Sequence, residues 1–248
     1  MKKYLSFIPL TLTSLLAFSA CESTKISAEE QSPIAIISIV GNQNISWVEE
    51  SPDEPQKDDE PEIDGLMTGL VNKFLYANDP ELLSAVNRLD YVYDSANQII
   101  PDMTGCAIVP KEEVFATQTY QYLRPSYFNS LVATENATGF KDLSTIGAKN
   151  ARNLMKECNA NSILIYSLTF QKRLNRGTRS EGLVEGIATM KVKLLNNRGR
   201  EIINKVFTEK TPAIKIQSGQ YDKNEMIANM NNAIDVLMRK FSVFYMSK

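Results

Sequence analysis

The chain has 248 residues, in which 27 Lys and Arg stand against 29 Asp and Glu, and it contains no histidine. Without histidine it cannot build a Ser–His–Asp triad, a Cys–His nucleophile or a zinc site with histidine ligands. A mildly acidic chain without a basic block also lacks the electrostatic footprint of a nucleic-acid-binding protein. CxxC, GxxxxGK[ST] and GxSxG motifs are absent from the sequence. We therefore expect a protein that is not an enzyme, holds no metal and binds no nucleic acid.

The first residues, MKKYLSFIPLTLTSLLAFSAC, have the organisation of a secretory signal. Lys2 and Lys3 precede an apolar run over residues 5–18, which is too short to span about 30 Å of hydrocarbon. The small residues before Cys21 make this segment resemble a bacterial lipoprotein signal. That resemblance implies cleavage after residue 20 and a covalent diacylglycerol and N-acyl lipid on Cys21. The alternative is a secreted protein with a chance cysteine.

The residue after Cys21 is Glu22, not the Asp that retains many such lipoproteins in the inner membrane, and this favours the periplasmic face of the outer membrane. Residues 21–32 are polar, and we expect them to tether the lipid to a single domain over residues 33–248. The stretch EESPDEPQKDDEPE, residues 49–62, holds eight carboxylates and three prolines. We predict that it is a disordered acidic insertion in that domain. It lacks the glycine turn and ligand spacing of a calcium loop.

Two amphipathic helices are predicted at about residues 64–77 and 80–99. Asp79 would cap the second, Pro80 would be its first residue, and Pro101 would end it. Their apolar stripe is compatible with either the inward face of a core helix or a face that contacts lipid. The candidates for membrane contact are Leu66, Met67, Leu70, Val71, Phe74, Leu75, Leu82, Leu83, Val86 and Leu89.

The rest of the chain predicts a mixture of strands and helices. The β-branched run at 34–40 is typical of a buried strand. The other predicted elements are a strand at 114–124, a helix at 145–158, a strand at 162–174, a turn at 175–182, hairpin strands at 188–196 and 201–211, and a last helix that begins at the capping pair Asp222 and Glu225. The apolar side of that last helix comprises Met226, Met230, Ile234, Leu237, Phe241, Phe244 and Tyr245.

Two more cysteines, Cys106 and Cys158, belong to the predicted mature chain. In a compartment that permits disulfides, a bridge between them would close a long loop, worth about 4 kcal/mol on the chain-entropy model. Cys158 also lies on the apolar face of a predicted helix, where a buried free thiol is equally natural. Both alternatives remain open at this point.

Three stretches carry a resemblance to a known superfamily: IAIISIV at 34–40, the turn Asn159-Ala160-Asn161 between a helix and a strand, and LLNNRGREII at 194–203 in the hairpin. They are similar to a bacterial envelope superfamily that includes the curli-channel lipoprotein, lipoprotein activators of peptidoglycan synthases and the N-terminal domain of the Tol translocation protein. The resemblance implies an α/β (α+β) fold, a mixed β-sheet flanked by helices in an α/β/α sandwich. With its extra amphipathic helices the chain also resembles the treponemal outer-membrane lipoproteins of the inner leaflet, which implies helices that insert into lipid and perturb the bilayer.

The leading hypothesis is a non-enzymatic outer-membrane lipoprotein whose amphipathic helices engage or perturb the bilayer, with membrane lipid as its partner. One alternative is a periplasmic interaction module that regulates an envelope enzyme or assembly machine, with an envelope protein or a second copy of the chain as partner. Another is a carrier of an apolar ligand. Lipid binding by the non-acylated chain distinguishes the first hypothesis from the second.

Overall fold

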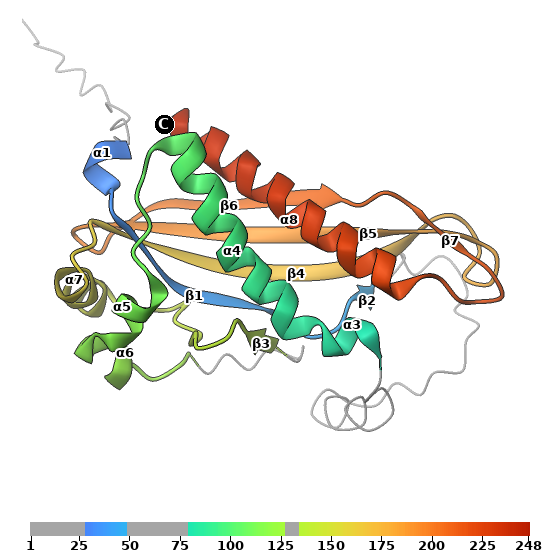
Figure 1. The fold of residues 1–248 in the computed structure, drawn as a ribbon, viewed down its shortest axis with the longest axis horizontal. Coiled ribbons are helices and arrows are strands. Elements are labelled where there is room, and N and C mark those ends of the chain that lie inside the picture. The colour runs from blue at the N-terminus through green and yellow to red at the C-terminus, as the bar shows by residue number, and fades with distance from the viewer. Residues whose placement is uncertain (1–27, 49–78, 127–133) are drawn as a thin grey trace, which may run out of the picture.

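The computed structural model describes residues 28–48, 79–126 and 134–248. These residues form an α+β fold in which helices flank a mixed seven-stranded sheet (Figure 1). The strands are β1 (Ile34–Asn42), β2 (Ser46–Trp47), β3 (Thr134–Asn136), β4 (Ser162–Gly177), β5 (Gly182–Asn196), β6 (Glu201–Lys210) and β7 (Ile214–Ile216). The helices are α1 (Ala28–Gln31), α3 (Pro80–Leu83), α4 (Ala85–Thr104), α5 (Lys111–Ala116), α6 (Gln118–Tyr122), α7 (Ala148–Glu157) and α8 (Lys223–Met246).

The sheet has the strand order β3-β1-β4-β5-β6, with β2 paired to β4 and β7 paired to β5. β1 and β4 are parallel, Ile34 lying opposite Ser162. Parallel neighbours require a crossover connection, and the chain between them supplies α3 to α7. β4, β5 and β6 follow as an antiparallel meander, which confirms the predicted hairpin.

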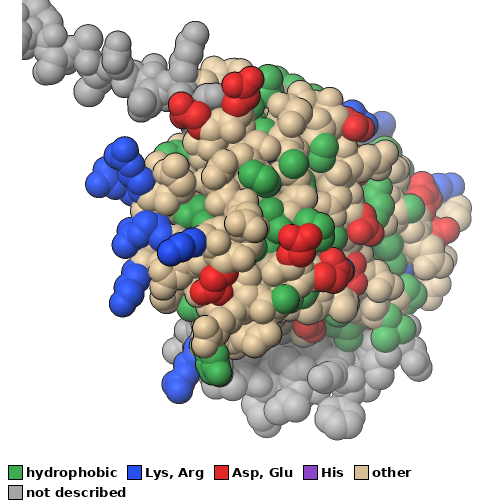
Figure 2. Space-filling view, turned by 60° about the vertical axis from the view of Figure 1, so that its left-hand side comes forward, with side chains coloured by type: hydrophobic (Ala, Val, Ile, Leu, Met, Phe, Trp, Pro, Cys, Tyr) green, Lys and Arg blue, Asp and Glu red, His purple; other side chains and the backbone are tan. Residues whose placement is uncertain are grey.

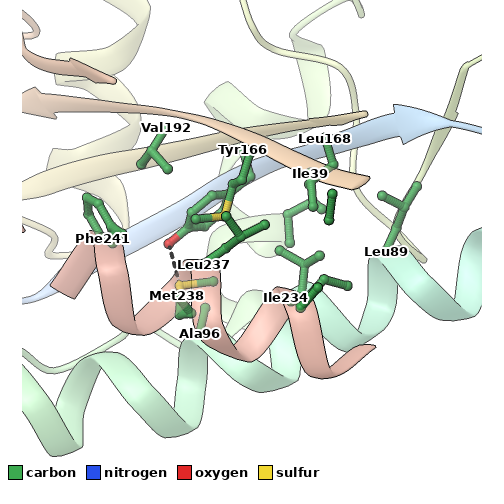
Figure 3. Packing of buried hydrophobic residues seen from close by; sticks show 14 of the residues in the cluster. Ile39, Leu89, Ala96, Tyr166, Leu168, Val192, Ile234, Leu237, Met238 and Phe241 are labelled. Atoms are coloured by element: carbon green, nitrogen blue, oxygen red, sulfur yellow. Dashed lines mark hydrogen bonds between the residues drawn. The ribbon is translucent and has the colours of Figure 1, made fainter. Parts of the chain in front are cut away.

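Two apolar clusters lie on opposite faces of this sheet. Tyr166 and Leu168 of β4 belong to the larger cluster, which α4 and α8 cover. Ile163 and Ile165 belong to the smaller one, which α5, α6 and α7 cover. Figure 3 shows the larger cluster, where Tyr166 donates a hydrogen bond to Met238 Sδ at 3.6 Å. The alternation along β4 therefore places one apolar face on each side of the sheet.

The last helix follows its sequence pattern closely. The Asp222 carboxylate accepts hydrogen bonds from the backbone N–H groups of Asn224 and Glu225, so it caps α8 as predicted. The predicted apolar side is buried from Met226 to Tyr245, except that Phe244 is half-buried. The predicted cap and the predicted apolar side both match α8, because this one long helix covers one continuous apolar surface.

The predicted strand at 114–124 is wrong, because this stretch forms α5 and α6. Thr117 is extended between the two helices, and its side chain caps α6 by accepting a hydrogen bond from Tyr120 N. The Phe115 and Tyr120 rings stack with centroids 5.0 Å apart. The aromatic and β-branched content that suggested a strand instead serves packing and capping in short helices.

Several predicted boundaries also differ. Pro101 does not end a helix but lies inside α4, which ends at Thr104 and is followed by the C-cap Gly105 in the left-handed conformation, with φ of 72°. The turn expected at 175–182 is shorter, since β4 continues to Gly177 and β5 starts at Gly182. The end of the expected tether belongs to the fold: α1 starts at Ala28, and the Gln31 carbonyl accepts a hydrogen bond from Ser162 Oγ at 2.6 Å.

We expect Leu237→Ala to destabilise the protein by about 2–5 kcal/mol, because Leu237 is fully buried between α8 and the sheet. Val243→Ala, on the exposed side of the same helix, should change stability by no more than about 0.5 kcal/mol. Urea unfolding followed by circular dichroism measures both. Equal losses in the two variants would contradict this packing.

Candidate functional site

Leu66, Met67, Leu70, Val71, Phe74 and Leu75 lie outside the described residues, as do Cys21 and the acidic stretch 49–62.

The structure places the other four candidates, and they do not share one surface. Leu82 and Val86 are half-buried, and Leu83 is 64% exposed. Leu89 is fully buried in the larger cluster, so close to β1 that a Cβ on Gly41 would lie 2.8 Å from Leu89 Cδ2. The prediction that Leu89 contacts lipid is therefore wrong, because the apolar stripe of α4 packs on the sheet and on α8.

A group of charged and aromatic residues gathers where β2, α3 and the end of β4 meet, and we call it the clasp. It consists of Trp47, Asp79, Glu81, Arg88, Lys172, Tyr221 and Lys223. Val48 N donates a hydrogen bond to the Lys172 carbonyl at 2.8 Å. Asp79 caps α3 and pairs with Lys223 at 2.7 Å. The two chain positions that border residues 49–78 are thus both held at the clasp.

A buried ion pair lies at the centre of the clasp. Lys172 Nζ lies 2.8 Å from Glu81 Oε2, and the two residues are only 9% and 4% exposed. Lys172 Nζ also lies 2.7 Å from the Tyr221 hydroxyl, which donates to the other Glu81 oxygen. Burial, followed by the Glu81 charge, raises the pKa of Tyr221. Both carboxylate oxygens of Glu81 are therefore engaged, as a buried charge requires.

Arg88 ties α4 to the same place. It is 1% exposed, and its guanidinium donates to the Glu81 carbonyl at 2.5 Å, to Ser84 Oγ at 2.6 Å and to the Gln43 carbonyl at 2.8 Å. Burial lowers the pKa of Arg88 to about 10, with the Glu81 charge acting in the opposite direction. At neutral pH the side chain is still a cation. This arrangement fastens α3 and α4 to the sheet.

Within the part of the chain that the structure describes, no three Cys, Asp or Glu side chains are grouped so that they could hold a metal ion. No helix among the described residues combines the length and apolar character needed to span a membrane.

The two buried cysteines are free thiols on opposite sides of the sheet. Cys106 lies in the larger cluster, with its Sγ 3.5 Å from the Tyr245 hydroxyl, whereas Cys158 lies in the smaller cluster behind α7. Of the two alternatives that the sequence left open, the structure therefore has the buried free thiols and not a Cys106–Cys158 disulfide, because the sheet separates the two residues. Burial raises the pKa of the Cys158 thiol, which makes it a poor nucleophile.

Sequence reasoning missed the clasp. Glu81 and Lys172 are 91 residues apart in the chain, and Glu81 and Tyr221 are 140 apart. The local signals were Asp79, which was predicted only as a helix cap, and Arg88, a charged residue directly before Leu89 in an otherwise apolar stripe.

Comparison of the chain with protein-family models and with curated proteins finds no match.

We expect Lys172→Met to destabilise the fold by about 3–5 kcal/mol, because it leaves the Glu81 carboxylate buried without its cation. The double variant Lys172→Met with Glu81→Gln should recover much of that loss. Lys223→Ala breaks a more exposed pair with Asp79 and should cost less than about 1 kcal/mol. Urea unfolding of the three variants tests this, and a loss for Lys172→Met no larger than that for Lys223→Ala would contradict a buried pair.

The number of free thiols can be measured with Ellman's reagent before and after unfolding. In the chain carrying Cys21→Ser, neither Cys106 nor Cys158 should react with Ellman's reagent while the protein is folded, because both side chains are buried. Two thiols should react after unfolding in urea without reductant. Finding none in the unfolded protein would mean that the two residues form a disulfide.

Proposed function

We propose that this protein is a non-enzymatic lipoprotein of the outer membrane, held on the periplasmic face by acyl chains on Cys21. We further propose that it makes a second, apolar contact with the bilayer through residues 64–77 and Leu83. Its similarity to the envelope lipoprotein superfamily named above is part of this proposal and explains the α/β/α arrangement.

The position of the first described residues supports the anchor. α1 starts at Ala28, seven residues after Cys21, and seven residues reach at most about 25 Å when extended. An acylated Cys21 would hold this end of the fold close to the membrane surface. A single acyl chain binds a membrane only marginally, so a stable anchor requires several chains or a second contact.

The observation that carries the apolar contact is the exposure of Leu83. This large side chain is 64% exposed on a helix whose N-terminal cap, Asp79, directly follows the stretch that contains six of the candidates. Because Leu89 belongs to the core, the contact is limited to the part of the stripe before α4. A single exposed leucine is common on protein surfaces, so Leu83 supports the contact through its position next to the six apolar candidates in the chain.

The distance between the two contacts fits the length of the chain. β1 has nine residues and is about 30 Å long, and it separates the tether from the clasp (Figure 1). Both ends of the 30 residues from 49 to 78 are held at the clasp, so the middle of this segment reaches at most about 50 Å from the clasp when extended. Both contacts can therefore be made with one membrane.

A second candidate function, an interaction module for an envelope protein or a second copy, is favoured by β6. This ten-residue strand is one edge of the described sheet, and Val206 on it is 52% exposed. An exposed edge strand is a template for strand addition by a partner.

Flotation of the mature chain with Cys21→Ser on neutral phosphatidylcholine vesicles separates the two functions. We expect the parent to float, and Leu70→Glu, Phe74→Glu and Leu83→Glu to lose flotation while they remain folded, because each places a charge on the apolar contact. Ala228→Glu, on the exposed side of α8, is the matched control and should float like the parent.

Failure of the parent to float would contradict the membrane contact and favour the interaction module. Unfolding of Leu70→Glu and Phe74→Glu together with failure to float would place those residues in the core.

A further inference from the structure

Five exposed cations lie on α7 and the turn after β5, at the end of the molecule that carries α1 (Figure 1). Lys149, Arg152 and Lys156 lie on α7 at i, i+3 and i+7, on the face opposite its buried residues. Arg198 and Arg200 lie in the turn between β5 and β6. We call these five residues the basic face. Figure 2 shows Lys and Arg side chains protruding together from one side of the molecule.

The basic face is built on a rigid contact between the helix and the turn. Arg152 Nη1 donates a hydrogen bond to the Arg198 carbonyl at 3.1 Å. Gly199 has a φ of 70° and packs so tightly that a Cβ there would lie 2.5 Å from the Ala148 carbonyl oxygen. Because backbone contacts hold the turn against α7, the five charges are arranged before any ligand binds.

The carboxylates next to these cations have partners of their own. Glu157 on α7 accepts hydrogen bonds from Thr119 N at 2.8 Å and from Thr119 Oγ1 at 2.5 Å, which turn it toward α6. These bonds lower the pKa of Glu157. Glu201, beside Arg200, accepts a hydrogen bond from Asn204 Nδ2 at 3.0 Å. These neutral donors do not remove the charge of either carboxylate, so five cations against these two carboxylates leave an excess of positive charge on the surface formed by α7 and the turn.

The basic face lies beside the point where the chain leaves for Cys21. Asn161, four residues after the end of α7, donates from its backbone N–H to the Pro33 carbonyl at 2.8 Å and from Nδ2 to the Ser32 carbonyl at 2.5 Å. α1 precedes these residues directly. Lipid on Cys21 would therefore bring the membrane surface to within reach of α7.

We propose that the basic face binds the phosphate headgroups of anionic phospholipids in the membrane that holds the acyl chains of Cys21. The occupant follows from charge complementarity and from the short reach of the tether, and the inference rests on the proposed function for the anchor. Clusters of four to eight cations beside a membrane anchor bind anionic leaflets, and each cation contributes about a fivefold gain in binding. The contact adds the second signal that a stable anchor requires.

The test compares binding of the mature chain with Cys21→Ser to phosphatidylcholine vesicles with and without phosphatidylglycerol. The parent should bind the anionic vesicles more tightly, and the difference should disappear at high salt because exposed charges are screened. Lys149→Glu with Lys156→Glu should weaken binding to the anionic vesicles by about tenfold or more. Both lysine side chains are exposed on α7, and circular dichroism checks that the variant stays folded.

The matched control is Arg239→Glu with Lys205→Glu. It changes the net charge equally, but these exposed cations lie on α8 and β6, on the side of the sheet that α8 covers. It should retain binding within about twofold. Equal losses in the two double variants would mean that net charge alone decides binding, and unchanged binding of the α7 variant would also overturn the inference. Parent binding to single-stranded DNA that matches its binding to anionic vesicles would point to a polyanion site and overturn it too.

The contact with anionic headgroups and the apolar contact can be tested independently with two variants. Leu70→Glu should reduce binding to neutral vesicles and leave the gain from phosphatidylglycerol in place, whereas the α7 variant should do the opposite. If Leu70→Glu binds neutral vesicles like the parent, the apolar contact of the proposed function is refuted. If the α7 variant keeps the parent's gain from phosphatidylglycerol, the basic face is refuted.

Discussion

β1 and β4 run side by side in the same direction, with Ile34 beside Ser162 and Gly41 beside Leu168, and the rest of the structure depends on this parallel pairing. Parallel strands cannot be joined by a tight turn, so the chain between them must travel from one end of the sheet to the other. It does so through α3 to α7, which cover parts of both faces. The starts of the two strands bring the tether beside the end of α7. Their far ends bring β2 and α3 to Lys172, where the clasp forms.

The two ends of β1 use charge in opposite ways. At the clasp, Glu81, Lys172 and Arg88 are buried and joined by short hydrogen bonds, so the loss of one partner is costly. On the basic face the cations are exposed to water, where each contributes little to folding. Such charges gain importance only against a surface of opposite charge. The charges of the clasp therefore stabilise the fold, whereas those of the basic face are available for binding.

Sequence patterns correctly predicted those strands and helices that bury one face against a single neighbouring surface. Alternation of Met190, Val192 and Leu194 with polar residues predicted a strand with one buried face, and a cap followed by an apolar periodicity predicted α8. The stretch 114–124 failed because its aromatic residues pack in short helices. The stripe of α4 was ambiguous because a helix on a core and a helix on a membrane share one periodicity.

The clasp and the basic face were harder to predict from the sequence, and the reason is the same for both. The clasp joins residues up to 140 positions apart, and the basic face joins cations from α7 and a distant turn. Neither forms a block in the sequence, so only the packing of the chain brings their charges together.

The intact mass of the mature protein extracted from membranes tests the central claim of a lipid anchor most directly. We expect the mass of residues 21–248 increased by a diacylglyceryl group and an N-linked acyl chain on Cys21, and no modification of a Cys21→Ser chain. An unmodified Cys21 in protein that has lost its first 20 residues would contradict the anchor.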